Sequence, residues 1–199
     1  YGNQPRIAQW NLARFAETLI PLINKDEKKS IKIAEEIINN FNSIYEHKWL
    51  EMMKNKLGIF EEEDEDLALI QNLISWMKTH KVDYTNTFCY LMNQKTGNTE
   101  IYKNSNFISW KTDWEDRLNR SQRSKDEIIN KMSSVNPLVI PRNHKVEEIL
   151  RDAETKDDYL SLKKLLKFIK YPYLFQEGIS IFQEPSGLPF KEYKTFCGT

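Results

Sequence analysis

The chain is poor in the residue types and patterns that define several large classes of protein. Its 199 residues include only two cysteines, Cys89 and Cys197, so a disulfide framework is excluded and a reducing compartment is expected. Basic and acidic residues number 29 each, which removes any overall attraction to nucleic acid or to an anionic membrane. No apolar run approaches the length of a membrane span. We therefore expect neither nucleic acid nor a membrane as a partner.

Motifs that bind nucleotides or carry out hydrolysis are also missing. The chain has no glycine-rich phosphate loop, no CxxC pair and no GxSxG nucleophile elbow. Its three histidines, His47, His80 and His144, lack metal-ligand spacing, so we interpret each as a surface or packing residue. These absences predict no common catalytic or metal motif within the chain.

What the sequence does contain is a persistent helical period, together with 5 Trp, 9 Tyr and 10 Phe for a packed core. Apolar residues recur every three or four positions, which is typical of helices with one buried face. In the helix expected over 107–120, for example, Trp110, Trp114 and Leu118 share one face. The expected helices cover about 10–23, 26–57, 67–77, 83–91, 107–120, 124–135, 145–154 and 158–170. We therefore expect a mainly α fold, with a loop over 1–9, one helical domain over 10–199 and an extended tail from about residue 172.

Local signals mark several helix ends. Asp83 is placed to cap one helix, and Ser124 with Glu127 three residues later forms a capping box. Pro21 is expected to kink or stop the first helix, and Gly58 to end the long second one.

The run of acidic residues over 61–66 has two interpretations. It could bind a cation or a basic partner, or it could be the amino terminus of the helix that follows, where acidic side chains complement the helix dipole. We favour the helix terminus because an apolar stripe begins directly after the run.

The densest polar cluster follows two prolines and contains Asn136, Arg142, Asn143 and His144. It could hold a phosphate or carboxylate at the amino terminus of a helix. The alternative, which we favour, is structural: Asn143 caps the helix and Arg142 pairs with a carboxylate across a domain junction. The stretch contains less glycine than an anion site normally recruits.

The two cysteines have different surroundings. Cys89 lies in the apolar stretch TFCYL, so we interpret it as a buried and inert thiol. Cys197, close to the last residue of the sequence, is expected to be exposed and is a candidate redox residue.

Several stretches together resemble the carboxyl-terminal part of the selenoprotein O family. They occur in the family's order and reach from the first residue to the last. They are YGNQP (1–5), IAQWNLA (7–13), DYTNTF (83–88), NPLVIPRNH (136–144) and YKTFCGT (193–199).

This resemblance implies a protein-kinase-like fold that transfers AMP from ATP to hydroxyl side chains of proteins with a divalent metal such as Mg²⁺. The family's nucleotide and metal sites precede the YGNQP stretch, so no catalytic, cofactor-binding or metal residue is carried onto this chain. Asn3 and Gln4 would lie at the end of the activation segment, and residues 10–199 would form the helical carboxyl-terminal lobe and its extension. Cys197 matches the family's redox ending.

We therefore expect a carboxyl-terminal fragment of a protein adenylyltransferase, inactive alone and binding neither ATP nor Mg²⁺. Its partners would be the missing amino-terminal catalytic portion and the protein substrates, in the bacterial cytoplasm or in a mitochondrion if the source is eukaryotic. Such a fragment should expose an apolar surface near its first helix. The alternative is a free-standing helical interaction module without catalysis.

Overall fold

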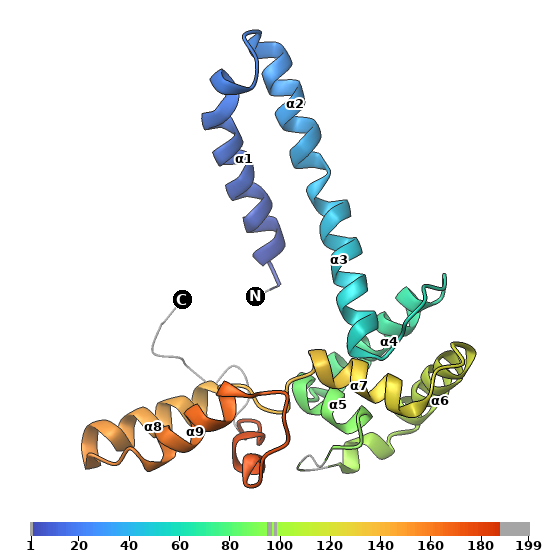
Figure 1. Cartoon of the computed structure of the whole chain (residues 1–199), viewed down its shortest axis with the longest axis vertical. Coiled ribbons are helices and arrows are strands. Elements are labelled where there is room, and N and C mark those ends of the chain that lie inside the picture. Colours follow the sequence, from blue (N-terminus) through green and yellow to red (C-terminus); the bar gives the residue numbers. More distant parts are fainter. Residues whose placement is uncertain (1, 95–96, 98, 188–199) are drawn as a thin grey trace. The chain divides into compact units, whose positions relative to one another are not determined.

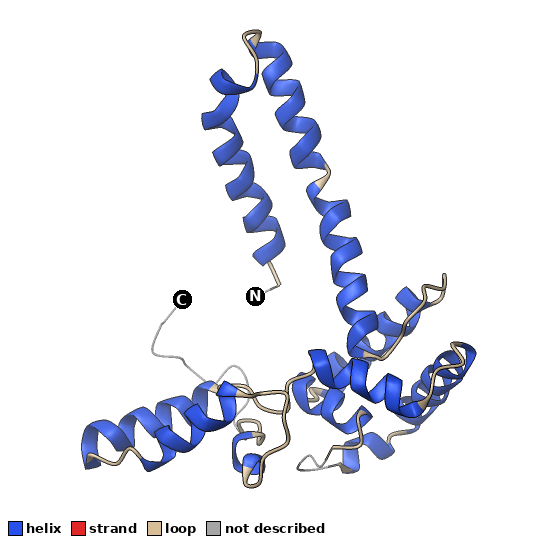
Figure 2. Ribbon diagram, in the orientation of Figure 1, coloured by secondary structure: helices blue, strands red, loops and turns tan. Residues whose placement is uncertain are grey.

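The structure, a computed structural model, describes residues 2–94, 97 and 99–187, and the chain divides into two compact units, Tyr1–Met53 and Lys54–Thr199. Within the described ranges the secondary structure is entirely helical (Figures 1 and 2), which confirms the mainly α class. Every helix among these residues is too short or too polar to traverse a lipid bilayer. The helices are α1 Gln4–Ile23, α2 Glu27–Asn39, α3 Phe41–Lys56, α4 Asp66–His80, α5 Tyr84–Leu91, η1 Glu100–Lys103, α6 Ser105–Arg120, α7 Lys125–Val135, α8 Asn143–Lys156, α9 Leu160–Lys170 and η2 Ile179–Phe182.

In the first unit, α1 and α2 form a helical hairpin (Figure 1). The Asp26 carboxylate caps α2 by accepting hydrogen bonds from the backbone N–H groups of Lys28 and Lys29, at 3.0 and 3.4 Å. Gln9 Nε2 donates to the carbonyl of Ile38 at 3.2 Å and links the two helices. A polar contact therefore links the two helices of the hairpin directly.

Two helix boundaries in the first unit differ from the sequence prediction. The first helix begins at Gln4, whereas we expected a loop over 1–9, because Pro5 occupies the first turn, where proline is compatible with a helix. The long helix expected over 26–57 is divided into α2 and α3 at Asn40. Asparagine has low helix propensity and is common at helix ends, and an apolar period that continues past it conceals the break.

The core of the second unit lies between α4 and α6. Ile70 and Leu73 of α4 are buried, as are the expected α6 residues Trp110 and Trp114. Both indoles keep a hydrogen-bond partner: Trp110 Nε1 donates to the carbonyl of Leu69 at 2.8 Å, and Trp114 Nε1 to that of Leu57 at 2.9 Å. Each tryptophan thus buries a large apolar surface without leaving its N–H group unpaired.

The remaining helices of the second unit begin and end largely as expected. The Ser124 hydroxyl accepts from the Glu127 N–H at 3.2 Å, and the Glu127 carboxylate accepts from the Ser124 N–H at 2.9 Å, which confirms the capping box. After α9 the chain folds back through η2, where the Phe182 ring lies 5.5 Å from that of Phe168. The described part of the expected tail, residues 172–187, is therefore packed rather than simply extended.

The expectation of one helical domain is corrected to two units. The first unit has almost no core of its own. Helix α1 buries none of its residues, and α2 buries only Ser30 and Ala34. Among the described residues, every buried aromatic side chain belongs to the second unit. Apolar periodicity, which is similar in both units, does not report this difference.

Candidate functional site: a buried polar junction

The candidate site is a junction in the second unit where the stretches 83–88 and 136–144 meet. Asp83 caps α5 by accepting a hydrogen bond from the Asn86 N–H at 2.8 Å, and Arg142 immediately precedes α8. The Arg142 guanidinium donates to both carboxylate oxygens of Asp83, Nη1 to Oδ2 at 2.6 Å and Nη2 to Oδ1 at 2.9 Å. The side chains are 8% and 19% exposed, so each charge is largely removed from water and neutralised by the other.

Asn86 and Gln183 extend this junction to the segment that follows α9. Arg142 Nη2 also donates to Asn86 Oδ1 at 3.2 Å, and Asn86 Nδ2 donates to the carbonyl of Gln183 at 3.0 Å. The Gln183 amide then donates from Nε2 to the carbonyl of Leu138 at 2.8 Å. The sequence analysis missed Gln183, and no local pattern distinguishes it from the exposed glutamines.

A second pair lies beside the junction. Lys56 Nζ donates to Asn136 Oδ1 at 3.0 Å, and Asn136 Nδ2 donates back to the carbonyl of Lys56 at 2.8 Å. The ammonium also lies over the rings of Phe88 and Tyr84, at 4.9 and 5.5 Å from their centroids. Burial lowers the pKa of Lys56. Asn136 is thus explained as the partner of a half-buried lysine that the sequence did not single out.

Cys89 lies beside this junction, and its environment suppresses the reactivity of its thiol. The side chain is fully buried, and Sγ donates weakly to the carbonyl of Pro137 at 3.6 Å. Burial, assisted by the charge of Asp83, raises the pKa of the thiol to about 11. Because the thiolate is the reactive form, this confirms the interpretation of Cys89 as an inert, buried residue.

The structure gives the members of the predicted polar cluster, residues 136–144, different partners and positions. Arg142 pairs with a carboxylate, as we expected, but its partner lies within the same unit rather than across a domain junction. The helix cap position is occupied by Arg142 and not by Asn143, which is exposed and is the first residue of α8. His144 follows it, and partial burial with the nearby charges of Lys145 and Arg142 lowers its pKa.

The other predicted residues lie elsewhere or outside the described residues. Asn3 is the cap position of α1, without a side-chain cap bond, and Gln4 is the first residue of that helix. Both are exposed and belong to the first unit. Cys197 falls outside the described residues.

The acidic run over 61–66 is paired inside the second unit. Arg117, buried in α6, donates from Nε to Asp66 Oδ1 at 2.7 Å and from Nη2 to the carbonyl of Glu61 at 2.8 Å. Glu63 bonds Arg120 at 2.7 Å, and Glu61 bonds Arg123 at 3.2 Å. Asp66 begins α4, as the favoured interpretation requires. Arg117 and Arg120 of α6, with Arg123 just after it, supply much of the opposite charge.

The junction is built to hold segments together. Asp83 and Arg142 neutralise each other, and burial favours the protonated form of the Cys89 thiol. Among the described residues, no group of three or more His, Cys, Asp or Glu side chains is placed to hold a metal ion. The fold and the junction thus define an all-helical scaffold that fixes three distant stretches of sequence, 83–86, 136–142 and the region around Gln183.

Comparison with known proteins identifies the family to which this scaffold belongs. The family model described as "Protein adenylyltransferase SelO" matches residues 1–170, so the chain belongs to the SelO family. Similar proteins include "Protein nucleotidyltransferase YdiU" of Pelagibacter ubique, 49% identical, and the proteins of the same name in Clostridium beijerinckii, 45%, and Bacillus cereus, 42%. Each alignment covers 100% of this chain but only 40–41% of the relative. The chain spans about two fifths of the length of these relatives.

Proposed function

We propose that this chain is the carboxyl-terminal, helical portion of a longer protein that transfers AMP from ATP to hydroxyl side chains of proteins. In this proposal the longer protein has a kinase-like fold and uses ATP and Mg²⁺. The nucleotide and metal sites lie in the part that this chain does not span. The chain itself supplies scaffold and a surface for the catalytic portion.

The observation that carries the proposal is the family match over residues 1–170. The relatives of known name, which are described as protein nucleotidyltransferases, align with the whole chain. The geometry is consistent with a supporting role, because the junction at Asp83 and Arg142 joins two of the stretches that carry the family resemblance. Nucleotidyl transfer needs cations and metal ions arranged around phosphates, and the charges at this junction are already paired with each other.

Three residues have specific roles in this proposal. Asn3 and Gln4 mark the end of the activation segment where it passes into α1. Cys197 is the redox residue of the carboxyl terminus. Both roles come from the family resemblance and are open to direct mutation in the longer protein.

The test is transfer of label from ATP by the full-length protein to itself and to an added protein acceptor. We expect label from the α-phosphate to become protein-bound in the presence of Mg²⁺, and label from the γ-phosphate to remain free. The 199-residue chain, assayed alongside, should transfer neither. Protein-bound γ-label would indicate a phosphotransferase and would contradict the proposal.

The alternative of a free-standing interaction module is favoured by one observation, the exposed apolar side chains of α1. Ile7, Trp10 and Phe15 are all more than half exposed. The two proposals differ in what the gene encodes and in what those side chains bind. A reading frame that encodes this chain alone would favour the module.

A further inference from the structure

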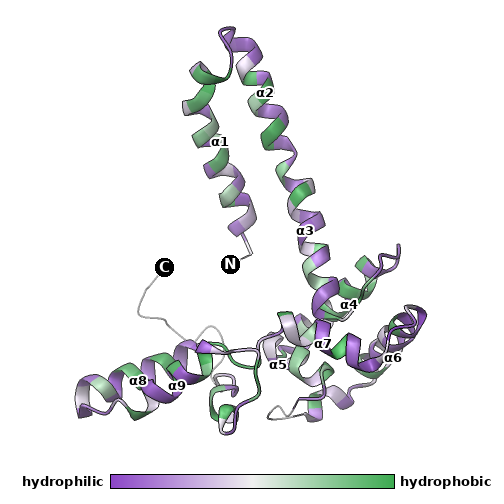
Figure 3. Cartoon of the chain, viewed as in Figure 1, coloured by the Kyte–Doolittle hydropathy of each residue, from purple (hydrophilic) through white to green (hydrophobic). Residues whose placement is uncertain are grey.

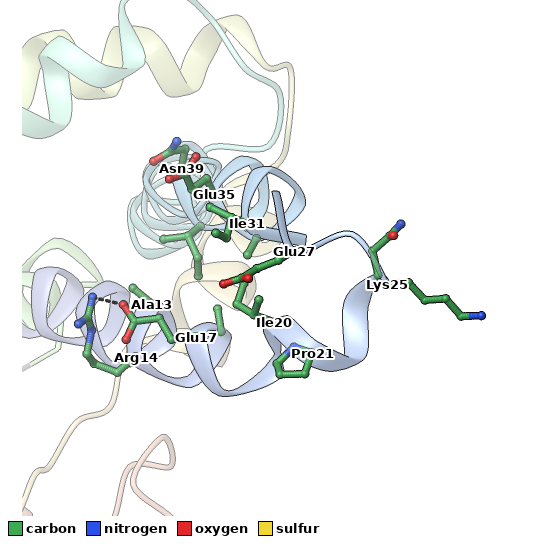
Figure 4. A pocket seen from close by; sticks show the side chains of 14 residues that line it. Ala13, Arg14, Glu17, Ile20, Pro21, Lys25, Glu27, Ile31, Glu35 and Asn39 are labelled. Carbon is green, nitrogen blue, oxygen red and sulfur yellow. Dashed lines mark ion pairs between the residues drawn. The ribbon is translucent and has the colours of Figure 1, made fainter. Parts of the chain in front are cut away.

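Helix α1 carries two apolar faces, of which only one is used inside its unit. Ala13, Ala16 and Ile20 face α2 and line a groove of about 880 Å³ with residues that include Ile31 and Ile38. Ile20 and Ile31 lie toward each other between the two helices (Figure 4), and hydrophobic residues recur along the whole of α1 (Figure 3). The hairpin contact therefore accounts for one side of α1.

The second face is a stripe of four residues that we call the outer stripe. Its members recur at intervals of three or four, which places them on one side of the helix. Each of Leu12 and Leu19 precedes a groove residue by one position, which turns the two faces apart by roughly 100°. The outer stripe comprises Leu12, Phe15, Leu19 and Leu22.

Three of the four members of the outer stripe are open to solvent, and Leu19 is half-buried. Leu12, Phe15 and Leu22 are 43%, 60% and 81% exposed, and no residue of α1 is buried. An ordered, uncharged row of large apolar side chains along a helix is unusual on the surface of a complete domain. Its regular spacing is that of residues that pack against a neighbouring helix.

The charge distribution restricts the chemistry of the partner. No member of the outer stripe is charged. The two charged residues within its span of sequence, Arg14 and Glu17, pair with each other at 2.6 Å and line the groove against α2. The stripe thus offers no charge that would attract nucleic acid or an anionic lipid surface. The complementary partner is an apolar protein face, such as one side of another helix.

We propose that the outer stripe is the docking surface for the part of the longer protein that this chain does not span. About three fifths of each relative's length lies outside the alignment with this chain. A covalently linked partner has a high effective concentration, so a modest apolar stripe is sufficient to hold it. The inference rests on the proposed function only in treating this chain as part of a longer protein.

The test is the accessibility of single cysteines introduced on and off the stripe. In a Cys197→Ser background, Phe15→Cys and Leu22→Cys report on the stripe, and Lys29→Cys, on an exposed part of α2, is the matched control. We expect maleimide to label the stripe positions at least about tenfold more slowly in the full-length protein than in the 199-residue chain. Lys29→Cys should react at the same rate in both.

Charged substitutions give an independent readout. Phe15→Asp and Leu22→Asp should leave the urea midpoint of the 199-residue chain nearly unchanged, because these positions are exposed in it. The same substitutions should lower the midpoint of the full-length protein, where a carboxylate would be buried in an apolar contact. The control Lys29→Asp should shift neither protein.

Several results would overturn the docking proposal. Equal labelling of the stripe in both proteins would show that nothing covers it. Protection already present in the 199-residue chain would assign the stripe to another part of this chain, or, if it grew with concentration, to a second copy. Neither readout measures AMP transfer, so a protected stripe in a full-length protein without transferase activity would refute the proposed function and leave the docking surface standing.

Discussion

At the scale of single residues, the second unit depends on charges that are removed from water in pairs. Arg142 with Asp83, and Arg117 with Asp66, each place a guanidinium against both oxygens of a carboxylate. Such a pair adds little stability compared with an apolar replacement, but the loss of one partner leaves the other charge buried and unpaired. These residues therefore determine which segments pack together, and they contribute less to the free energy of folding.

Asp83→Asn should destabilise the second unit by about 2 kcal/mol, since asparagine still caps α5 but no longer neutralises Arg142. The value is below that of a fully buried pair because Asp83 is partly exposed. Urea unfolding followed by circular dichroism measures it. Glu115→Gln, in the exposed pair with Lys111, is the matched control and should cost no more than about 0.5 kcal/mol. Equal costs for the two variants would show that the junction charge is unimportant.

Cys89 predicts a loss of stability at alkaline pH. The folded state raises the pKa of its thiol from 9.0 to about 11, so the folded state holds the proton more tightly than the unfolded chain. The resulting stabilisation is complete below pH 9.0 and is lost as the pH rises through about 11. Between these values the free energy of unfolding should fall by about 2 kcal/mol more in the wild type than in Cys89→Ala. Burial raises the pKa of Tyr102 in both proteins, and Cys89 adds only a minor contribution to that rise, so parallel pH profiles would contradict the assignment.

At the scale of helices, the sequence predicted what local chemistry controls. The caps at Asp83 and Ser124 and the tryptophan face of α6 were predicted and found, because each depends on residues within about one or two turns. The partners Lys56 and Gln183 were not predicted, because each is specified by a residue far along the chain. Asn143 was wrongly assigned as a cap because Arg142 occupies that position while its side chain is held by Asp83.

Gly58 follows the end of α3 and allows α7 to pack closely against this position. Its φ of +74° favours glycine, and an added Cβ would lie 2.7 Å from Ile128 Cγ2 and 3.1 Å from Met132 Cγ. Gly58→Ala should therefore cost about 2–4 kcal/mol, from backbone strain and from overpacking against α7. Gly97→Ala is the control and should be nearly neutral, because an added Cβ there would have no atom of the described residues within 4 Å beyond its chain neighbours. Thermal unfolding of the two variants checks the difference.

At the scale of the whole molecule, the two units differ in how complete they are. The second unit encloses an aromatic core and pairs its buried charges, whereas α1 in the first unit buries none of its residues. The chain belongs to the SelO family and spans about two fifths of the length of its relatives. The proposed function would explain the difference between the units, because in that proposal the chain is scaffold for an enzyme whose nucleotide site lies in the remaining part. The mainly α class could be predicted from apolar periodicity. That the first unit lacks a core could be recognised only from the exposure of its side chains in the structure.

The central claim is that the nucleotide site belongs to the remaining part of the longer protein and not to this chain. Calorimetric titration of Mg-ATP into the full-length protein and into the 199-residue chain, at matched concentrations, tests it most directly. The account predicts saturable binding by the full-length protein and no detectable heat of binding with the chain. Tight binding of Mg-ATP by the 199-residue chain would contradict it.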